Sequence, residues 1–153
     1  MKKFILILSL LMGTLAFGKE SDILGKWITE KADNGNQIIV QFHEENNKFY
    51  GIIDNLTIPV YGTNEKYSGK KKMDLKNPNP SLRSKTLVGS KFVYKCTYNK
   101  DKNKWEDGSI YNPENGKTYH CSITFKNINT IIVKGSLDSL GLIGKKQIWK
   151  RVK

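Results

Sequence analysis

The segment Trp105–Cys121, WEDGSIYNPENGKTYHC, contains most of the residue types that enzymes use for catalysis, namely acids, a serine, a histidine and a cysteine. A serine or cysteine nucleophile needs a histidine within hydrogen-bond reach to take its proton. His120 and Cys121 are adjacent, so in a strand their side chains point to opposite faces. The same alternation separates Glu106 from Asp107. The segment therefore predicts no convergent catalytic group, and we expect that the protein is not an enzyme.

The histidines and cysteines do not form a recognisable metal motif. His43-Glu44-Glu45 is not the helical HExxH arrangement of zinc enzymes. His120 and Cys121 face apart in a strand, so they cannot both ligate one ion. The sequence also contains no glycine-rich phosphate loop. We expect neither a metal nor a cofactor.

Cys96 and Cys121 raise the question of a disulfide. They lie in the strand-like segments Lys91–Tyr98 and Lys117–Phe125, with Trp105–Tyr111 between them in the sequence. If the three segments form a meander, the outer two are about 10 Å apart. A disulfide needs Cα atoms within about 7 Å of each other. The spacing favours two free thiols, with a disulfide as the alternative.

These residues must be positioned by short strands, because the chain alternates strand-like segments with turn residues. The segments are rich in Ile, Val, Thr, Tyr, Phe and Trp, and Asn, Asp and Gly separate them. The expected strands are Leu24–Glu30, Gln37–His43, Lys48–Ile58, Leu87–Tyr98, Trp105–Tyr111, Lys117–Lys126, Thr130–Leu137 and Lys145–Val152. They predict an all-β fold, an eight-stranded antiparallel up-and-down barrel, with a β-sandwich as the alternative.

Alternation within the strands predicts which aromatic side chains face the interior of the barrel. The inward set comprises Phe92, Tyr94, Tyr98, Tyr119 and Phe125. A barrel of eight strands holds either packed side chains or one small ligand, so these rings either fill a core or line a cavity. Trp105 and Tyr111 raise the same question, because they lie in one arm of a hairpin whose turn is Asn112–Gly116.

The chain opens with MKKFILILSLLMGTLAFG, in which Lys2 and Lys3 precede the apolar run Phe4–Phe17. Small residues at Ala16 and Gly18 complete the pattern of a secretory signal peptide over residues 1–18. The apolar run has 14 residues, fewer than the roughly 20 that a membrane-spanning helix needs. We expect an exported protein, periplasmic or secreted, that does not span the membrane.

Residues 19–153 are expected to form a single, monomeric barrel domain with a basic surface. Removing the two lysines of the signal peptide lowers the formal charge from +12 to +10. Most lysines are scattered, and the chain has just two arginines, Arg83 and Arg151. Because phosphate-binding surfaces favour the bidentate guanidinium group, we expect no nucleic-acid partner.

The two ends of this domain carry a pattern that resembles the lipocalins and calycins. Gly25-Lys26-Trp27 stands in the first expected strand, and Arg151 stands in the last. First and last strands are neighbours in a closed barrel, so the cation of Arg151 would lie over the indole of Trp27. The resemblance implies that Gly25, Trp27 and Arg151 close one end of the barrel.

Longer stretches resemble a more specific family. They are DLKNPNPSLR (Asp74–Arg83), LVG (Leu87–Gly89), WEDGSIYNPENGKTY (Trp105–Tyr119) and GKKQIWKRV (Gly144–Val152). They are similar to the bacterial exported family named domain of unknown function 2147 (DUF2147), from about Gly25 to Val152. The resemblance implies a lipocalin-like barrel, a periplasmic or secreted address and no established activity. The family usually has an acid where Asn112 stands here, so we expect a turn role at Asn112 and no charge-dependent one.

The long loop at residues 59–86 permits two interpretations. Two Asn-Pro pairs disfavour helix there and predict an extended lid, in which Asp74 and Arg83 pair or cap turns. Alternatively, the lid surrounds the mouth of a pocket, and Arg83 meets an anionic ligand. The candidate ligand-binding residues are Asp74, Asn77, Arg83, Phe92, Tyr94, Trp105, Tyr111 and Tyr119.

Together these patterns predict an exported protein of lipocalin-like type that binds a small, partly apolar molecule or an envelope component. The alternative is a non-enzymatic envelope interaction or inhibitor protein that acts through its basic surface.

Overall fold

The computed structural model describes residues 19–153, so the predicted signal peptide at 1–18 lies outside the described residues. The strands are β1 (Gly25–Ile28), β2 (Ile38–Glu45), β3 (Lys48–Leu56), β4 (Lys91–Asn99), β5 (Lys104–Asn112), β6 (Lys117–Asn127), β7 (Thr130–Ser136) and β8 (Gly144–Arg151). Two short 3₁₀ helices, η1 (Glu20–Ile23) and η2 (Pro80–Leu82), complete the described elements.

The strands form a closed antiparallel barrel in sequence order, which confirms the predicted fold and excludes the sandwich. Each strand pairs with the next, and β8 returns to pair with β1 through Trp27 and Arg151. The β1–β8 contact is short: only Lys150 and Arg151 of β8 pair with β1, and the Ile148 amide donates to the Glu30 carboxylate instead. The first four residues of the predicted fourth strand do not belong to a strand. Leu87–Ser90 forms a turn instead, in which Ser90 N–H donates to the Leu87 carbonyl and Gly89 has a φ of +91°.

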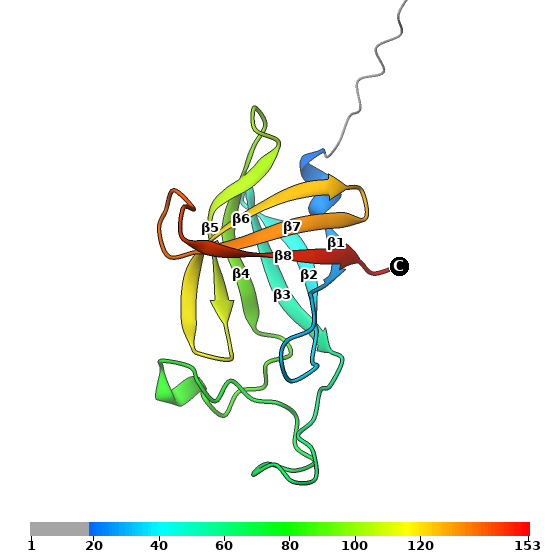
Figure 1. Cartoon of the computed structure of the whole chain (residues 1–153), viewed down its shortest axis with the longest axis vertical. Helices are drawn as coiled ribbons and strands as arrows, with labels where there is room; N and C mark the ends of the chain where they lie inside the picture. Colours follow the sequence, from blue (N-terminus) through cyan, green and yellow to red (C-terminus); the bar gives the residue numbers. More distant parts are fainter. Residues whose placement is uncertain (1–18) are drawn as a thin grey trace, which may run out of the picture.

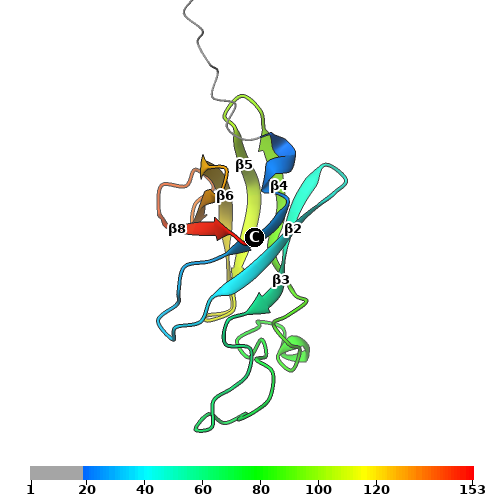
Figure 2. The ribbon, with the colours of Figure 1, turned by 90° about the vertical axis from the view of Figure 1, so that its right-hand side faces the viewer.

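The barrel has two different ends (Figure 1). We call the closed end the one that carries η1 and the β2–β3, β4–β5 and β6–β7 turns. We call the open end the one that carries the β1–β2, β3–β4, β5–β6 and β7–β8 loops. The view in Figure 2 places η1 beside the β4–β5 turn and the long β3–β4 loop at the opposite end of the molecule.

Aromatic rings fill the interior at the closed end. Trp105 is fully buried, and its ring packs against Phe49, Tyr98 and Phe125 at centroid distances of 4.8–6.2 Å. Phe125 also meets Trp27 edge-on, at 5.8 Å. Rings of this size each bury a large apolar area and prefer such tilted contacts. The closed end is therefore a packed core.

Gly108 on β5 allows the two cysteines to approach each other. A side chain at Gly108 would place its Cβ 2.3 Å from Cys96 Sγ, so the glycine leaves the space above β5 to the Cys96 thiol. Cys96 and Cys121, on the flanking strands, are buried free thiols. A hydrogen bond with Cys96, together with burial, raises the pKa of the Cys121 thiol. The two thiols are free and hydrogen-bonded to each other, so their side chains lie closer than strand spacing alone implied.

Neither short helix within residues 19–153 is long and apolar enough to cross a membrane.

Candidate functional site

The open end holds a cavity of about 940 Å³. Its apolar wall includes Ile38, Leu56, Leu87, Phe92, Ile110 and Val133, from β2, β3, β4, β5, β7 and the β3–β4 loop. Pockets of roughly 300–1,000 Å³ with mainly apolar walls are typical of small-molecule sites. The cavity is therefore the leading candidate site of this chain.

The cavity exists because the inward side chains become smaller toward the open end. Along β7 the inward positions are Ile131, Val133 and Gly135, and the last two of these line the cavity. The floor of the cavity is aromatic, since Phe92 stacks on the buried Trp149 at 5.9 Å. Trp149 packs in turn against Phe42. This layer separates the cavity from the packed closed end.

Charged side chains surround the mouth of the cavity. Of the three acids, Glu30 and Glu65 accept hydrogen bonds from the backbone amides of Ile148 and Gly62, while the carboxylate of the exposed Glu114 has no partner within residues 19–153. The lysines differ: within residues 19–153, the ammonium groups of three exposed lysines at the mouth have no hydrogen-bond or ion-pair partner. They are Lys76, Lys117 and Lys145. The described part of the mouth therefore has three free ammonium groups and one free carboxylate, that of Glu114.

A buried hydrogen-bond cluster fastens the long β3–β4 loop to the barrel. Tyr111 on β5 donates its hydroxyl proton to Asp74 Oδ1 at 2.6 Å, and Asn77 Nδ2 donates to Asp74 Oδ2 at 2.7 Å. Arg83 Nε donates to the carbonyl oxygen of Asn77 at 2.8 Å. Burial, together with the bond to Asp74, raises the pKa of Tyr111 far above its ordinary value. Asp74 and Arg83 thus do not pair directly, and both bind Asn77.

A second, smaller pocket of about 530 Å³ lies where this loop meets β4 and β5. Its lining includes Asp74, Asn77, Tyr94 and Tyr111. Tyr94 was expected to share a face with Phe92, but it lines this second pocket while Phe92 lines the cavity. The cause is irregular backbone: the β3–β4 register shifts twice, and Lys95 has a φ of +52°. Such bulges break the two-residue period of side-chain direction.

The candidate ligand-binding residues are thus divided among four places: the cavity, the second pocket, the packed core and the exposed surface. Phe92, Tyr111 and Tyr119 line the cavity, and Tyr111 also lines the second pocket. Trp105 lies in the packed core of the closed end. Arg83 is exposed and lies outside the lining of both pockets.

Sequence reasoning did not select the three lysines at the mouth. The signal for Lys117 and Lys145 was present, because Lys117 is the first residue of β6 and Lys145 the second residue of β8, both just after an open-end loop. Lys76 could not be found in this way, since its position depends on the path of the long loop.

The residues that suggested catalysis are dispersed. His120 is exposed, whereas Cys121 is buried on the opposite face of β6. Within residues 19–153, no group of three or more His, Cys, Asp or Glu side chains is placed to hold a metal ion.

Arg151 and Trp27 meet at the closed end. The guanidinium carbon of Arg151 lies 4.2 Å from the centre of the Trp27 ring. The same guanidinium donates to the carbonyl oxygens of Asp22, Leu24 and Ile128. Gly25 has a φ of +104°, a conformation that disfavours any side chain, and a Cβ there would lie 3.6 Å from the guanidinium. The cation therefore connects η1, β1 and the β6–β7 turn.

A closed eight-stranded barrel, packed at one end and hollow at the other, defines a protein of the lipocalin-like class. The solved structure of protein HP1028 from Helicobacter pylori, described as belonging to the lipocalin family, is similar, with a TM-score of 0.67 and 29% identity. The match covers 85% of this chain and 82% of that one. Residues 25–151 match the family model for uncharacterized proteins conserved in bacteria, DUF2147, and the chain belongs to that family. No curated protein matches the chain.

Proposed function

We propose that the protein is exported and binds one small, partly apolar molecule in the cavity at the open end. The observation that carries this proposal is the difference in side-chain size along the barrel. Large rings fill the closed end, while Val133 and Gly135 leave about 940 Å³ beside them at the open end. Apolar walls favour an apolar ligand body because they remove it from water.

The mouth favours a ligand with an anionic end. Lys76, Lys117 and Lys145 have no partners within residues 19–153, and of the acids there only Glu114 has a free carboxylate, because Glu30 and Glu65 accept from backbone amides. A cation near a low-dielectric wall interacts more strongly with an anion than it does in bulk water. The preferred ligand is an amphiphile whose tail lies against Phe92 and whose acidic group lies among the lysines.

The test is native mass spectrometry of the mature protein purified from its own cell envelope. We expect a reproducible extra mass that mild denaturation releases. Gly135→Leu should abolish it, because the new side chain enters the cavity from a position where a Cβ meets its nearest neighbour, Ile110 Cγ2, at an ordinary 3.4 Å. Thr118→Leu, on the exposed face of β6, is the matched control and should retain the extra mass.

Repeated absence of any extra mass in the wild-type protein, together with failure to bind the amphiphilic anion anilinonaphthalene sulfonate, contradicts the proposal. Binding to anionic polymers with a steep salt dependence would then favour the alternative, an envelope interaction protein that acts through its basic surface. An export address is tested separately, by the mass of the mature N-terminus and by fractionation of the cells.

A further inference from the structure

The β7–β8 loop, residues 137–143, carries the most exposed large apolar side chains of residues 19–153. The exposed fractions are 67% at Leu137, 83% at Leu140, 80% at Leu142 and 64% at Ile143. The other exposed apolar side chains in the described part reach at most 50%. An apolar group that gathers on one loop of a soluble domain marks an interaction site more often than single exposed residues do.

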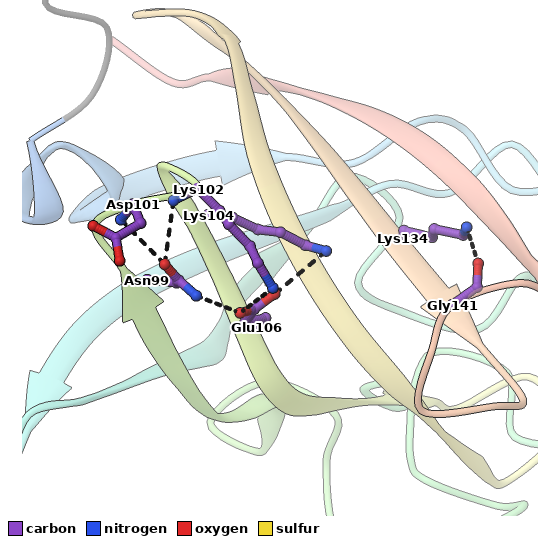
Figure 3. Close-up of polar contacts among 7 residues, drawn as sticks. All are labelled: Asn99, Asp101, Lys102, Lys104, Glu106, Lys134 and Gly141. Carbon is purple, nitrogen blue, oxygen red and sulfur yellow. Dashed lines mark hydrogen bonds and ion pairs between the residues drawn. The ribbon is translucent and has the colours of Figure 1, made fainter.

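The loop is held in this shape by hydrogen bonds. The Asp138 carboxylate accepts from the backbone amides of Leu142 and Ile143 at 2.8 and 2.6 Å, and these bonds lower the pKa of Asp138. Leu137 N–H donates to the Ile143 carbonyl at 2.8 Å. Lys134 Nζ donates to the Gly141 carbonyl (Figure 3). Because this turn is already ordered, it loses little further conformational entropy when a partner binds its exposed leucines.

Cations flank the exposed leucines. Lys145 and Lys146 follow the loop after Gly144 and are exposed, and Lys76 and Lys117 lie at the neighbouring cavity mouth. The carboxylate of Asp138 is the one acid within the loop, and it is occupied by the two amides. The surface therefore combines projecting apolar side chains with uncompensated positive charge.

A lipid surface fits this combination better than a second copy of the chain. One loop of four apolar side chains offers less than the roughly 800 Å² per partner that stable protein interfaces bury. A second copy would also bring the same lysines, and residues 19–153 carry a formal charge of +10. An anionic bilayer attracts basic residues near its surface and accepts apolar side chains without shape complementarity.

We propose that the β7–β8 loop docks the protein on an anionic lipid surface, with Leu140 and Leu142 inserted among the lipids. Leu137 and Ile143 also line the cavity, so docking brings the mouth of the cavity to the bilayer. In Figure 1 the loop projects from the left side of the barrel, at the end of β8 opposite the C-terminus. The docking surface does not require that the cavity be occupied.

The experiment is co-sedimentation of the mature protein with vesicles of phosphatidylcholine containing about one-third phosphatidylglycerol. We expect binding that weakens with salt and falls at least tenfold on vesicles of phosphatidylcholine alone. The double variant Leu140→Ser/Leu142→Ser should lose at least tenfold in affinity. Because both side chains are exposed, the variant should keep its thermal midpoint. Ile128→Ser, at the closed end and 50% exposed, is the matched control and should bind like the wild type.

A second readout follows insertion directly. The three native tryptophans are fully buried, so a Leu140→Trp variant adds one exposed indole, whose emission should shift to the blue on anionic vesicles. Gly135→Leu should leave vesicle binding unchanged, which separates this proposal from ligand binding in the cavity. Equal vesicle binding by the double serine variant and the wild type overturns the proposal. A wild-type dimer that the same variant dissociates also overturns it, because the loop would then join two copies.

Discussion

The closed and open ends of this barrel are built from the same strands but differ in what fills them. At the closed end, Trp27, Trp105 and Phe125 occupy the interior in ring contact. At the open end, Val133 and Gly135 stand at equivalent inward positions and leave a cavity of about 940 Å³. The alternation of inward and outward residues is common to both ends. The size of the inward side chain decides which end is a core and which is a site.

The charged side chains at the two ends also differ in whether they have partners. At the closed end, Glu106 accepts from Asn99 at 2.8 Å and pairs with Lys102 and Lys104 (Figure 3). These contacts, the bond from Asn99 first, lower the pKa of Glu106. At the open end, the lysines of the mouth have no such partners within residues 19–153. Satisfied groups stabilise the fold at one end, and unsatisfied groups remain for a ligand at the other.

The largest expected effect is the loss of a ring from the closed core. Trp105→Ala should lower the free energy of unfolding by about 3–5 kcal/mol, because it leaves a cavity among Phe49, Tyr98 and Phe125. Tyr119→Ala, at the cavity, should cost clearly less, since Tyr119 already borders empty space. Urea unfolding followed by circular dichroism measures both. Equal losses would show that the two ends are packed alike.

The two arginines provide the next comparison. Arg151→Ala removes a cation from the Trp27 ring and three donors from backbone carbonyls, and should cost about 2 kcal/mol. Arg83→Ala removes one exposed hydrogen bond and should cost less than about 0.5 kcal/mol. Thermal unfolding of both variants measures the difference. If Arg83→Ala proved the more damaging change, the long loop and not the closed end would hold the greater stability.

The contacts at the closed end could be predicted from the sequence because they follow from the order of the strands. Seven of the eight strands begin within one residue of the predicted positions, and closure placed Arg151 beside Trp27. Side-chain directions could not be predicted from the sequence where the backbone departs from regular pleating. The bulges in β4 turned Tyr94 away from the face of Phe92, and no local pattern marks them. The three lysines at the mouth come together through loops, whose paths depend on contacts such as that of Asp74 with Tyr111.

The third prediction concerns the hydrogen bond from Tyr111 to Asp74. Tyr111→Phe leaves the buried Asp74 carboxylate without one donor, and should cost about 1 kcal/mol and loosen the β3–β4 loop toward proteases. The pKa of Tyr111 is raised in the folded protein, so its contribution is complete below the pKa of the unfolded chain, about 10. The contribution is lost as pH rises from there toward the folded value.

The difference in unfolding free energy between the wild type and Tyr111→Phe should therefore stay constant up to about pH 10 and shrink above it. Urea unfolding at a series of pH values measures this difference. Tyr119→Phe is the control: its hydroxyl accepts from the exposed Asn115 and does not touch a buried carboxylate, so its cost should be smaller. A difference that grows with pH would mean that Tyr111 does not hold Asp74 as a donor.

The smallest expected effect concerns Asn112, the last residue of β5. Its side-chain oxygen accepts from Glu114 N–H at 2.9 Å, and its carbonyl accepts from Asn115 and Gly116. A carboxylate accepts the same bond, so Asn112→Asp should change the free energy of unfolding by less than about 0.5 kcal/mol. Asn112 also lines the cavity mouth, so the added negative charge should weaken binding of anilinonaphthalene sulfonate while leaving stability unchanged. If Asn112→Asp lowered the free energy of unfolding but left anion binding unchanged, Asn112 would stabilise the fold and would not belong to the ligand site at the open end.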